Sequence, residues 1–474
     1  MTKPVEERMQ TLEDEDIQGF MFTSYARYLH CAGYLLLRVT DDGGEAARGW
    51  LGELVDKIST GKQRSKEERR QEIFALTIAF TSTGLDRLGF SPEELATFSR
   101  PFQEGMATER RAITLGDTDN SDPKNWEWGN LTNRVDILFM IFALNEEVLA
   151  EQLKLRRDEI KACGGLEEVK LFEAGRQVDA KEHFGYLDGV GQPIIEGSGK
   201  AMNQLRRTGH ATVVKAGEFI LGYNNELGVK DDVPRTSEML EFGKNGTYIV
   251  FRQMEQHVSA FWTFLEEATR RDGVSDPEAR ERLGAKMVGR WKSGAPVSLH
   301  RDRDPHDGVP PKVDENDFGY AKDDAQGFGC PIGAHIRRTN PRDALPPNPE
   351  KALKSAKRHR IIRQGRSYGK HSDDVFVDDG KERGLHFICL NSDIERQFEF
   401  IQQTWVNNKK FDGLYDEVDP LIGKLKDCNS FTVQEDPLRT RVHNLGEFVT
   451  IKGGSYFFMP GIKALRHIAG LKNS

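Results

Sequence analysis

The sequence has no long hydrophobic run and no dense cluster of basic residues. No stretch approaches the roughly 20 consecutive apolar residues of a membrane-spanning helix. The net charge is −8, and the one locally basic stretch, residues 351–363, is isolated. The chain therefore lacks the clustered Lys and Arg that contacts to phosphates require. We expect neither a membrane nor a nucleic acid as a partner.

Paired cysteines and the common catalytic signatures are also missing. The five cysteines (Cys31, Cys163, Cys330, Cys389, Cys428) are far apart, and no two have CxxC spacing. This argues against a disulfide framework and against a cysteine-ligated zinc or iron–sulfur site. GxxxxGKS/T, HExxH and GxSxG do not occur. The first 19 residues are charged, without an apolar signal core or twin arginine, so we expect a cytoplasmic protein; the oligomeric state stays open.

The first half of the chain predicts a β-α-β-β-α-β order. Strands are expected at 34–39, 74–80, 135–143 and 168–172, and helices at 46–58 and from Asn145, a suitable N-cap. Residues 74–80 (FALTIAF) alternate large and small side chains with period two, and one face suits close helix packing. This order predicts an α+β, ferredoxin-like domain with an antiparallel sheet, and residues 89–133 would be an insertion.

The second half repeats this plan. Strands are expected at 247–253, 385–390 and 454–458, and helices at 255–269 and 392–405, the latter opened by Ser392 and Glu395 in capping-box spacing. More than 100 irregular residues separate the first helix from the strand at 385, and long irregular segments are usually functional or disordered. With 474 residues, we predict two ferredoxin-like domains, 1–215 and 216–474.

The segment 183–197 (HFGYLDGVGQPIIEG) has one acid, Asp188, among three glycines. Glycine lets the backbone turn sharply or approach a flat ligand closely. An acid in such a loop can be a general acid or base, a metal ligand or a turn-forming residue. The sequence alone does not decide among these three roles.

Two further segments carry a histidine and several arginines. In 329–342 (GCPIGAHIRRTNPR), His335 follows Gly333 and Ala334, small residues that leave room for a porphyrin face. A single histidine is more often structural than a ligand. Arg363, in 360–369 (RIIRQGRSYG), is either a surface charge or a buried group that needs an anionic partner.

Together these segments resemble the dye-decolourising (DyP-type) peroxidase family, in its longer bacterial and fungal subgroup. Gly185–Gly189 matches the GxxDG motif, AHIRRTNPR resembles the proximal-histidine motif, and Arg363 stands where a distal arginine is expected. Further similarity includes DIQG (16–19), AFTSTGL (79–85), GEFILGY (217–223), NGTYIVFRQ (245–253) and GGSYFFMPG (453–461). Gly191 replaces a serine that is common in the family.

The resemblance implies a peroxidase that reduces hydrogen peroxide and oxidises bulky organic donors, such as dyes and phenols, by one-electron steps. It implies haem b (iron protoporphyrin IX), mainly in the C-terminal domain, with His335 as axial iron ligand. Asp188 would move a proton between the peroxide oxygens, and Arg363 would stabilise charge as the O–O bond breaks. Since a neighbouring guanidinium favours an ionised carboxylate, activity is expected at acidic pH.

Other residues are assigned to the haem pocket by the same resemblance. An acid in DIERQF, Asp393 or Glu395, would accept the second N–H of His335; we favour Glu395, although its capping-box role explains it equally well. Leu385 and Phe387 would wall the pocket, with core packing as the alternative, and Arg342 would meet a propionate. Competing functions are a haem-binding or haem-handling protein with little peroxidase turnover, a haem-free structural protein, and chlorite dismutation, which does not explain the GxxDG acid.

Overall fold

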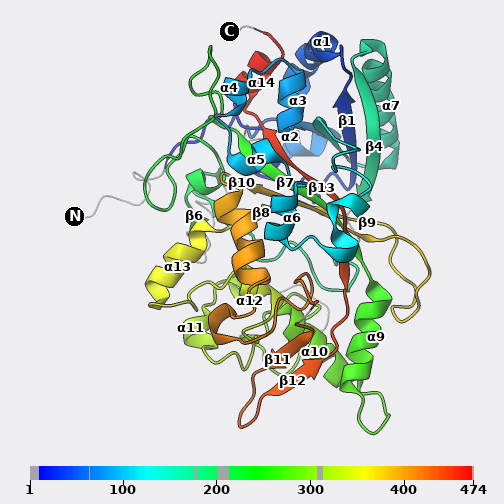
Figure 1. The fold of residues 1–474 in the computed structure, drawn as a ribbon, viewed down its shortest axis with the longest axis vertical. Helices are drawn as coiled ribbons and strands as arrows, with labels where there is room; N and C mark the ends of the chain where they lie inside the picture. Colours follow the sequence, from blue (N-terminus) through cyan, green and yellow to red (C-terminus); the bar gives the residue numbers. More distant parts are fainter. Residues whose placement is uncertain are drawn as a thin grey trace.

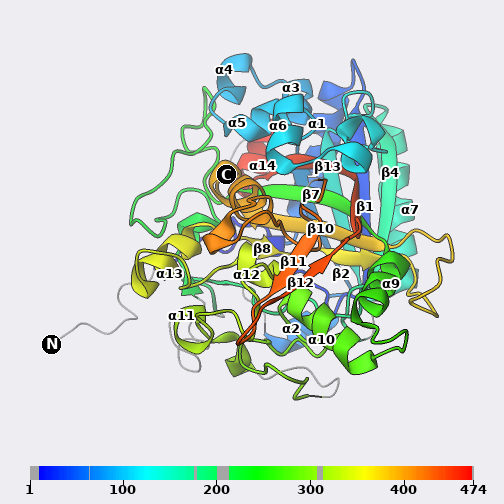
Figure 2. The same ribbon diagram turned by 60° about the horizontal axis from the view of Figure 1, so that its bottom comes forward.

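The structure, a computed structural model, describes residues 10–62, 65–175, 179–199, 213–306, 313–426 and 428–471. Its main element is a nine-stranded sheet in which both halves of the chain take part (Figures 1 and 2). The N-terminal half contributes four strands: β1 (Cys31–Val39), β2 (Phe74–Phe80), β3 (Ile137–Ala143) and β4 (Leu166–Gly175). The C-terminal half contributes five: β7 (Thr247–Gln256), β8 (Ile362–Arg363), β9 (Arg366–Tyr368), β10 (Gly384–Asn391) and β13 (Val449–Met459).

The strand order confirms the two ferredoxin-like units. The order is β4-β1-β3-β2 in the first half and β13-β7-β10-β8 in the second, with β9 also paired to β10. Both are the same fourth-first-third-second arrangement, and every pairing among these strands is antiparallel. The two halves of the sheet are joined where Phe80 of β2 pairs with Phe458 of β13. The domain boundary at residue 215 remains a prediction.

In Figure 1, helices of the first half lie beside the sheet, whereas most helices of the second half extend away from it, except the last, which packs against the first half. The first half contains α1 (Gly44–Leu54), α2 (Lys66–Gln71), α3 (Ser82–Arg87), α4 (Pro92–Leu95), α5 (Arg100–Glu104), α6 (Glu109–Leu115) and α7 (Glu146–Cys163). The second contains α9 (Val258–Thr269), α10 (Pro277–Val288), α11 (Tyr320–Asp323), α12 (His335–Thr339), α13 (Pro349–Arg358) and α14 (Ile462–Ile468). Among the described helices, none has both the length and the apolar character needed to cross a bilayer.

Alternation along the strands builds two cores. On one face, large residues such as Leu76 and Ile78 pack with Trp50 of α1 and Leu153 of α7. On the other face, residues from both halves form a second core, in which Tyr34 contacts Phe251 with ring centroids 5.8 Å apart. Both cores contain residues from the two halves of the chain, so the halves are packed together.

Local signals predicted most elements, with small shifts at their ends. Asn145 caps α7 as expected, accepting a hydrogen bond from the N–H of Val148 at 2.9 Å. The helix expected at 46–58 ends at Leu54 and continues as a 3₁₀ turn, η3 (Val55–Lys57). The helix expected from 255 begins at Val258, because β7 extends to Gln256.

The capping box predicted at Ser392 and Glu395 is wrong. The helix there is π-wound, as η8 (Glu395–Glu399) and η9 (Ile401–Val406). Asp393 is the capping residue instead: its Oδ1 accepts the N–H of Arg396 at 2.9 Å. Its own N–H is bound by the side chain of Gln397, four residues on.

Candidate active site

The loop that carries Asp188 is shaped by a neighbouring acid, Glu182. One oxygen of Glu182 accepts the N–H of Phe184 at 2.8 Å and the side-chain amide of Gln256 at 2.6 Å. The other accepts the N–H of Tyr186 at 2.9 Å. Desolvation of this carboxyl group outweighs these hydrogen bonds and raises its pKa to about 7. The side chain of Glu182 therefore holds together the part of the loop that leads to Asp188.

The structure brings Asp188 and Arg363 together. Nη1 of Arg363 lies 3.6 Å from Oδ1 of Asp188, and both side chains are about 40% exposed. Oδ1 also accepts the N–H of Gly189 at 2.6 Å, so the turn-forming role is present as well. Nη2 of Arg363 donates to the carbonyl of Val190 at 2.9 Å. A carboxylate and a guanidinium therefore stand side by side, accessible and fixed to the same loop.

Residues 190–192 attach this loop to β8. The side chain of Gln192 accepts the N–H of Arg363 at 3.2 Å and donates to its carbonyl. The carbonyl of Gly191 accepts from Nη2 of Arg360 at 2.7 Å. Gly191 has φ +78°, in the left-handed region that favours glycine, which accounts for glycine at this position.

His335 is held by a buried aspartate that the sequence did not reveal. Its Nδ1 lies 2.9 Å from Oδ2 of Asp419, which is 0% exposed. Oδ1 of Asp419 accepts the N–H groups of Leu421 and Ile422 at 2.9 and 3.0 Å. Burial alone would raise the pKa of Asp419, but His335 and these two N–H groups hold it below its ordinary value. In the described part of the chain, Nε2 of His335 has no hydrogen bond.

Asp419 replaces the predicted partner of His335. Glu395 is 53% exposed and lies 3.4 Å from Arg111, and Asp393 caps the π-helix. The expectation that Glu395 orients the histidine was therefore wrong. The only sequence signal at Asp419 is that Pro420 follows it. An Asp-Pro pair indicates a turn but does not predict the contact to His335.

Four arginines gather beside the Asp188 loop. All four donate to backbone carbonyls: Arg290 to Gly294 at 2.7 Å, Arg342 to Phe318 at 2.8 Å, Arg360 to Gly191, and Arg363 to Val190. Burial, together with repulsion from Arg342 and Arg363, lowers the pKa of Arg290 to about 10 and that of Arg360 to about 9. Among the described residues, only Arg363 of the four has a carboxylate within 4 Å. Such a cationic cluster suits an anionic ligand.

This cluster also links the two predicted segments. Arg342 follows α12, which begins at His335, whereas Arg363 belongs to β8. Since Arg290 and Arg360 each interact electrostatically with both, the histidine segment and the β8 segment border the same region. A cavity of about 270 Å³ opens beside Arg342 and Arg360. The neighbouring arginines and this cavity therefore support the predicted contact of Arg342 with an anionic group.

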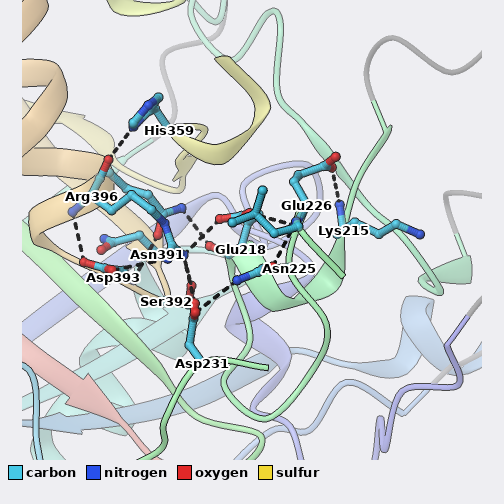
Figure 3. A network of polar contacts seen from close by, with 12 residues as sticks. Lys215, Glu218, Asn225, Glu226, Asp231, His359, Asn391, Ser392, Asp393 and Arg396 are labelled. Carbon is cyan, nitrogen blue, oxygen red and sulfur yellow. Dashed lines mark hydrogen bonds and ion pairs between the residues drawn. The ribbon is translucent and has the colours of Figure 1, made fainter. Parts of the chain in front are cut away.

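A polar network holds the segment before β8 in place (Figure 3). Arg396 pairs with three carboxylates: Glu218 at 3.1 Å, Asp231 at 3.0 Å and Asp393 at 3.4 Å. Nδ1 of His359 lies 2.5 Å from the carbonyl of Arg396, and Gln397 donates to the carbonyl of Arg360 at 2.6 Å. The π-helix thereby fixes residues 359–360, and with them the arginines that follow.

Leu385 and Phe387 lie on the same face of the sheet as Arg363. Arg363 is directly opposite Cys389 in the antiparallel pair, so their side chains share one face. Alternation along β10 puts Leu385 and Phe387 on that face too, and both are half-buried, whereas His386 and Ile388 on the other face are buried. Both also pack against the core on this face, as the core-packing alternative expects, and their contact with a haem stays a prediction.

A family model matches part of the chain, and curated proteins match most of it. The model, described as the DyP dimeric alpha+beta barrel domain, matches residues 52–169. The dye-decolorizing peroxidase of Exidia glandulosa is 32% identical over 413 residues, which cover 83% of this chain and 75% of that protein. The multifunctional dye peroxidase DyP2 of Amycolatopsis sp. is 31% identical over 366 residues, covering 73% and 74%.

Solved structures share the fold over nearly the whole chain. One, from a study of an ancestral D-type dye decolorizing peroxidase, has a TM-score of 0.80 at 26% identity and covers 96% of this chain and 99% of its own. Another, a dye-decolorizing peroxidase in complex with 2,6-dimethoxyphenol, has a TM-score of 0.77 at 25% identity and covers 97% and 100%.

Proposed function

The chain belongs to the DyP-type (dye-decolourising) peroxidase family, and from this premise we propose that Asp188, Arg363 and His335 form its peroxide-reducing centre. The protein is a hydrogen-peroxide-dependent oxidoreductase that takes electrons from organic donors, as its relatives' names imply. The observation that carries the assignment is the Asp188–Arg363 pair, 3.6 Å apart, in the same molecule as an imidazole fixed by a buried carboxylate.

Haem b is the cofactor that we propose for this centre. Nε2 of His335 would hold its iron, since Asp419 already binds the other ring nitrogen, a common arrangement for metal-bound histidine. Arg342 and Arg360, buried without a described carboxylate, would meet the propionates, and Leu385 and Phe387 would contact the ring. When bound, the iron supplies an open position for peroxide and stores the two oxidising equivalents.

The roles of the two distal residues follow from their geometry. The carboxylate of Asp188 is accessible, so it can take a proton from one peroxide oxygen and return it to the other. The guanidinium of Arg363 is fixed by Val190 and stabilises the negative charge that develops as the O–O bond breaks. Overall, hydrogen peroxide takes up two electrons and two protons and leaves as two waters, with two donor molecules each giving one electron.

We also propose a cytoplasmic location. All five cysteines are free thiols, and three of them are buried. Unpaired cysteines in this number are typical of a reducing compartment. Fractionation of the source cells with an antibody to the chain tests this part of the proposal: recovery outside the cell would contradict it.

The test of the function compares the native holoprotein with an Asp188→Ala/Arg363→Ala double variant. Both are expected to show a Soret band, because neither residue is a proposed iron ligand. Stoichiometric hydrogen peroxide should change the native spectrum within seconds and leave the variant nearly unchanged, and dye oxidation should be lost in the variant. Equal and negligible dye oxidation in both would instead favour a haem-binding or haem-handling protein.

A further inference from the structure

A second group of ligand-type side chains lies outside the proposed haem site. His300, His306 and Glu315 converge, and their ligand atoms all lie within 4.8 Å of one another. Nε2 of His306 is 2.6 Å from Oε1 of Glu315, and Nε2 of His300 is 3.8 Å from Oε2. Each of the two imidazoles thus faces a different oxygen of the same carboxylate.

Hydrogen bonding alone leaves this cluster incomplete. The His306–Glu315 contact is a good hydrogen bond, but Oε2 of Glu315 is buried and has no hydrogen-bond partner among the described residues. A buried carboxylate oxygen without a partner is costly. The distance of 3.8 Å to His300 is too long for a hydrogen bond, yet it is close to the ligand–ligand separation of about 3.4 Å around a tetrahedral ion with bonds of about 2.1 Å.

The cluster is anchored to the wall of the proposed haem site. The carbonyl of His300 accepts from the indole N–H of Trp291 at 2.7 Å. Next to Glu315, Asn316 accepts from Arg290 through its side chain and from Arg342 through its carbonyl, both at 2.9 Å. An ion held by both imidazoles and by Glu315 would connect residues 300–306 to the element that supports these two arginines.

We propose that His300, His306 and Glu315 bind a divalent first-row transition ion, with Zn²⁺ as the best fit. Two imidazoles and one carboxylate form a three-residue donor set that zinc accepts, with a fourth position left to water. Each imidazole would coordinate through Nε2, and Glu315 would exchange its hydrogen bond with His306 for a bond to the ion. The site clamps η7 (Val313–Asn316) to the preceding loop, and it is independent of the peroxidase assignment.

The experiment measures zinc bound to the full-length holoprotein. After equilibrium dialysis against Zn²⁺, zinc is counted by mass spectrometry and the chain is counted in the same sample by quantitative amino-acid analysis, so that the result does not depend on the haem content. We expect one zinc per chain in the native protein and a loss of affinity beyond about 100-fold in Glu315→Gln and in His300→Ala, since changes next to metal ligands alone cost 10–100-fold. His443→Ala is the matched control, because His443 is exposed on β12 (Thr440–His443).

Two outcomes would overturn the proposal. One is zinc binding that Glu315→Gln and His300→Ala leave unchanged, and the other is a native protein that takes up no zinc at micromolar concentration. As a measurement that needs no variant, Zn²⁺ should slow proteolytic cleavage within residues 299–306 of the native protein. Cleavage at an unchanged rate would also contradict the clamp.

Discussion

On the His335 side of the proposed site the decisive contact is buried, whereas on the Asp188 side it is exposed. Asp419 is fully buried, 2.9 Å from the imidazole, and bound by two backbone N–H groups. Asp188 and Arg363 are 3.6 Å apart and about 40% exposed; the N–H of Gly189 binds the carboxylate, and the carbonyl of Val190 binds the guanidinium. The difference suits the two proposed roles, because an iron ligand has to stay in one orientation, while a proton-transferring acid has to meet a reactant from solution.

The largest effect is expected from removing the acid on the exposed side. Asp188→Asn removes the group that takes up the proton but keeps the shape of the side chain. The rate of the reaction with hydrogen peroxide should fall about 10²–10⁴-fold, the usual contribution of a positioned acid or base, measured by stopped-flow absorbance. Haem content should not change. Asp179→Asn, at an exposed acid of the same loop, is the matched control; a rate for Asp188→Asn equal to that of this control would refute the assignment.

A smaller and different effect is expected from breaking the buried side. Asp419→Asn leaves His335 without a charged partner, so the imidazole is less basic and less firmly oriented. Haem should leave about 10–100-fold faster, as measured by transfer to an excess of apo-globin. Asp41→Asn, at an exposed acid of the N-terminal half, should leave the haem off-rate unchanged. Equal off-rates in the two variants would mean that Asp419 does not support the ligand.

The sequence predicted the fold well because its signals are local. Period-two alternation marked β2 to the residue, and the Asn145 cap marked the start of α7, since both depend on neighbours in the chain. The winding of the helix after β10 was missed, because a π-helix leaves the same apolar stripe as an α-helix over so short a length.

The candidate site was predictable only in part, for a physical reason. Asp188, His335 and Arg363 lie in segments whose resemblance to a family is specific. Asp419 is 84 residues away from His335 and stands in an irregular loop, so no periodicity connects the two. Arg360 likewise contacts the Asp188 loop through the carbonyl of Gly191, which lies 169 residues earlier in the chain, so no local pattern predicts this contact.

A moderate effect of pH is expected on the exposed side, through Glu182. Its pKa is raised to about 7 in the folded protein, above the ordinary 4.5, so the folded state holds this proton more tightly than the unfolded chain does. This contribution to stability is complete below pH 4.5 and is lost as the pH rises to about 7. The unfolding midpoint of the native protein, relative to Glu182→Gln, should therefore fall between pH 5 and pH 8. A constant difference would contradict the raised pKa.

The smallest effect is expected at Gly191, where the exposed loop depends on backbone shape. Gly191→Ala requires a β-carbon at φ +78° and should lower the free energy of unfolding by about 1–2 kcal/mol, the cost of a left-handed non-glycine residue. The new methyl group would meet Nη2 of Arg290 at an ordinary distance of 3.5 Å, so strain rather than collision sets this value. Gly49→Ala in α1 has open space around it and should be neutral or stabilising. Denaturant titration of both variants separates the cases, and equal stabilities would show that the loop relaxes without cost.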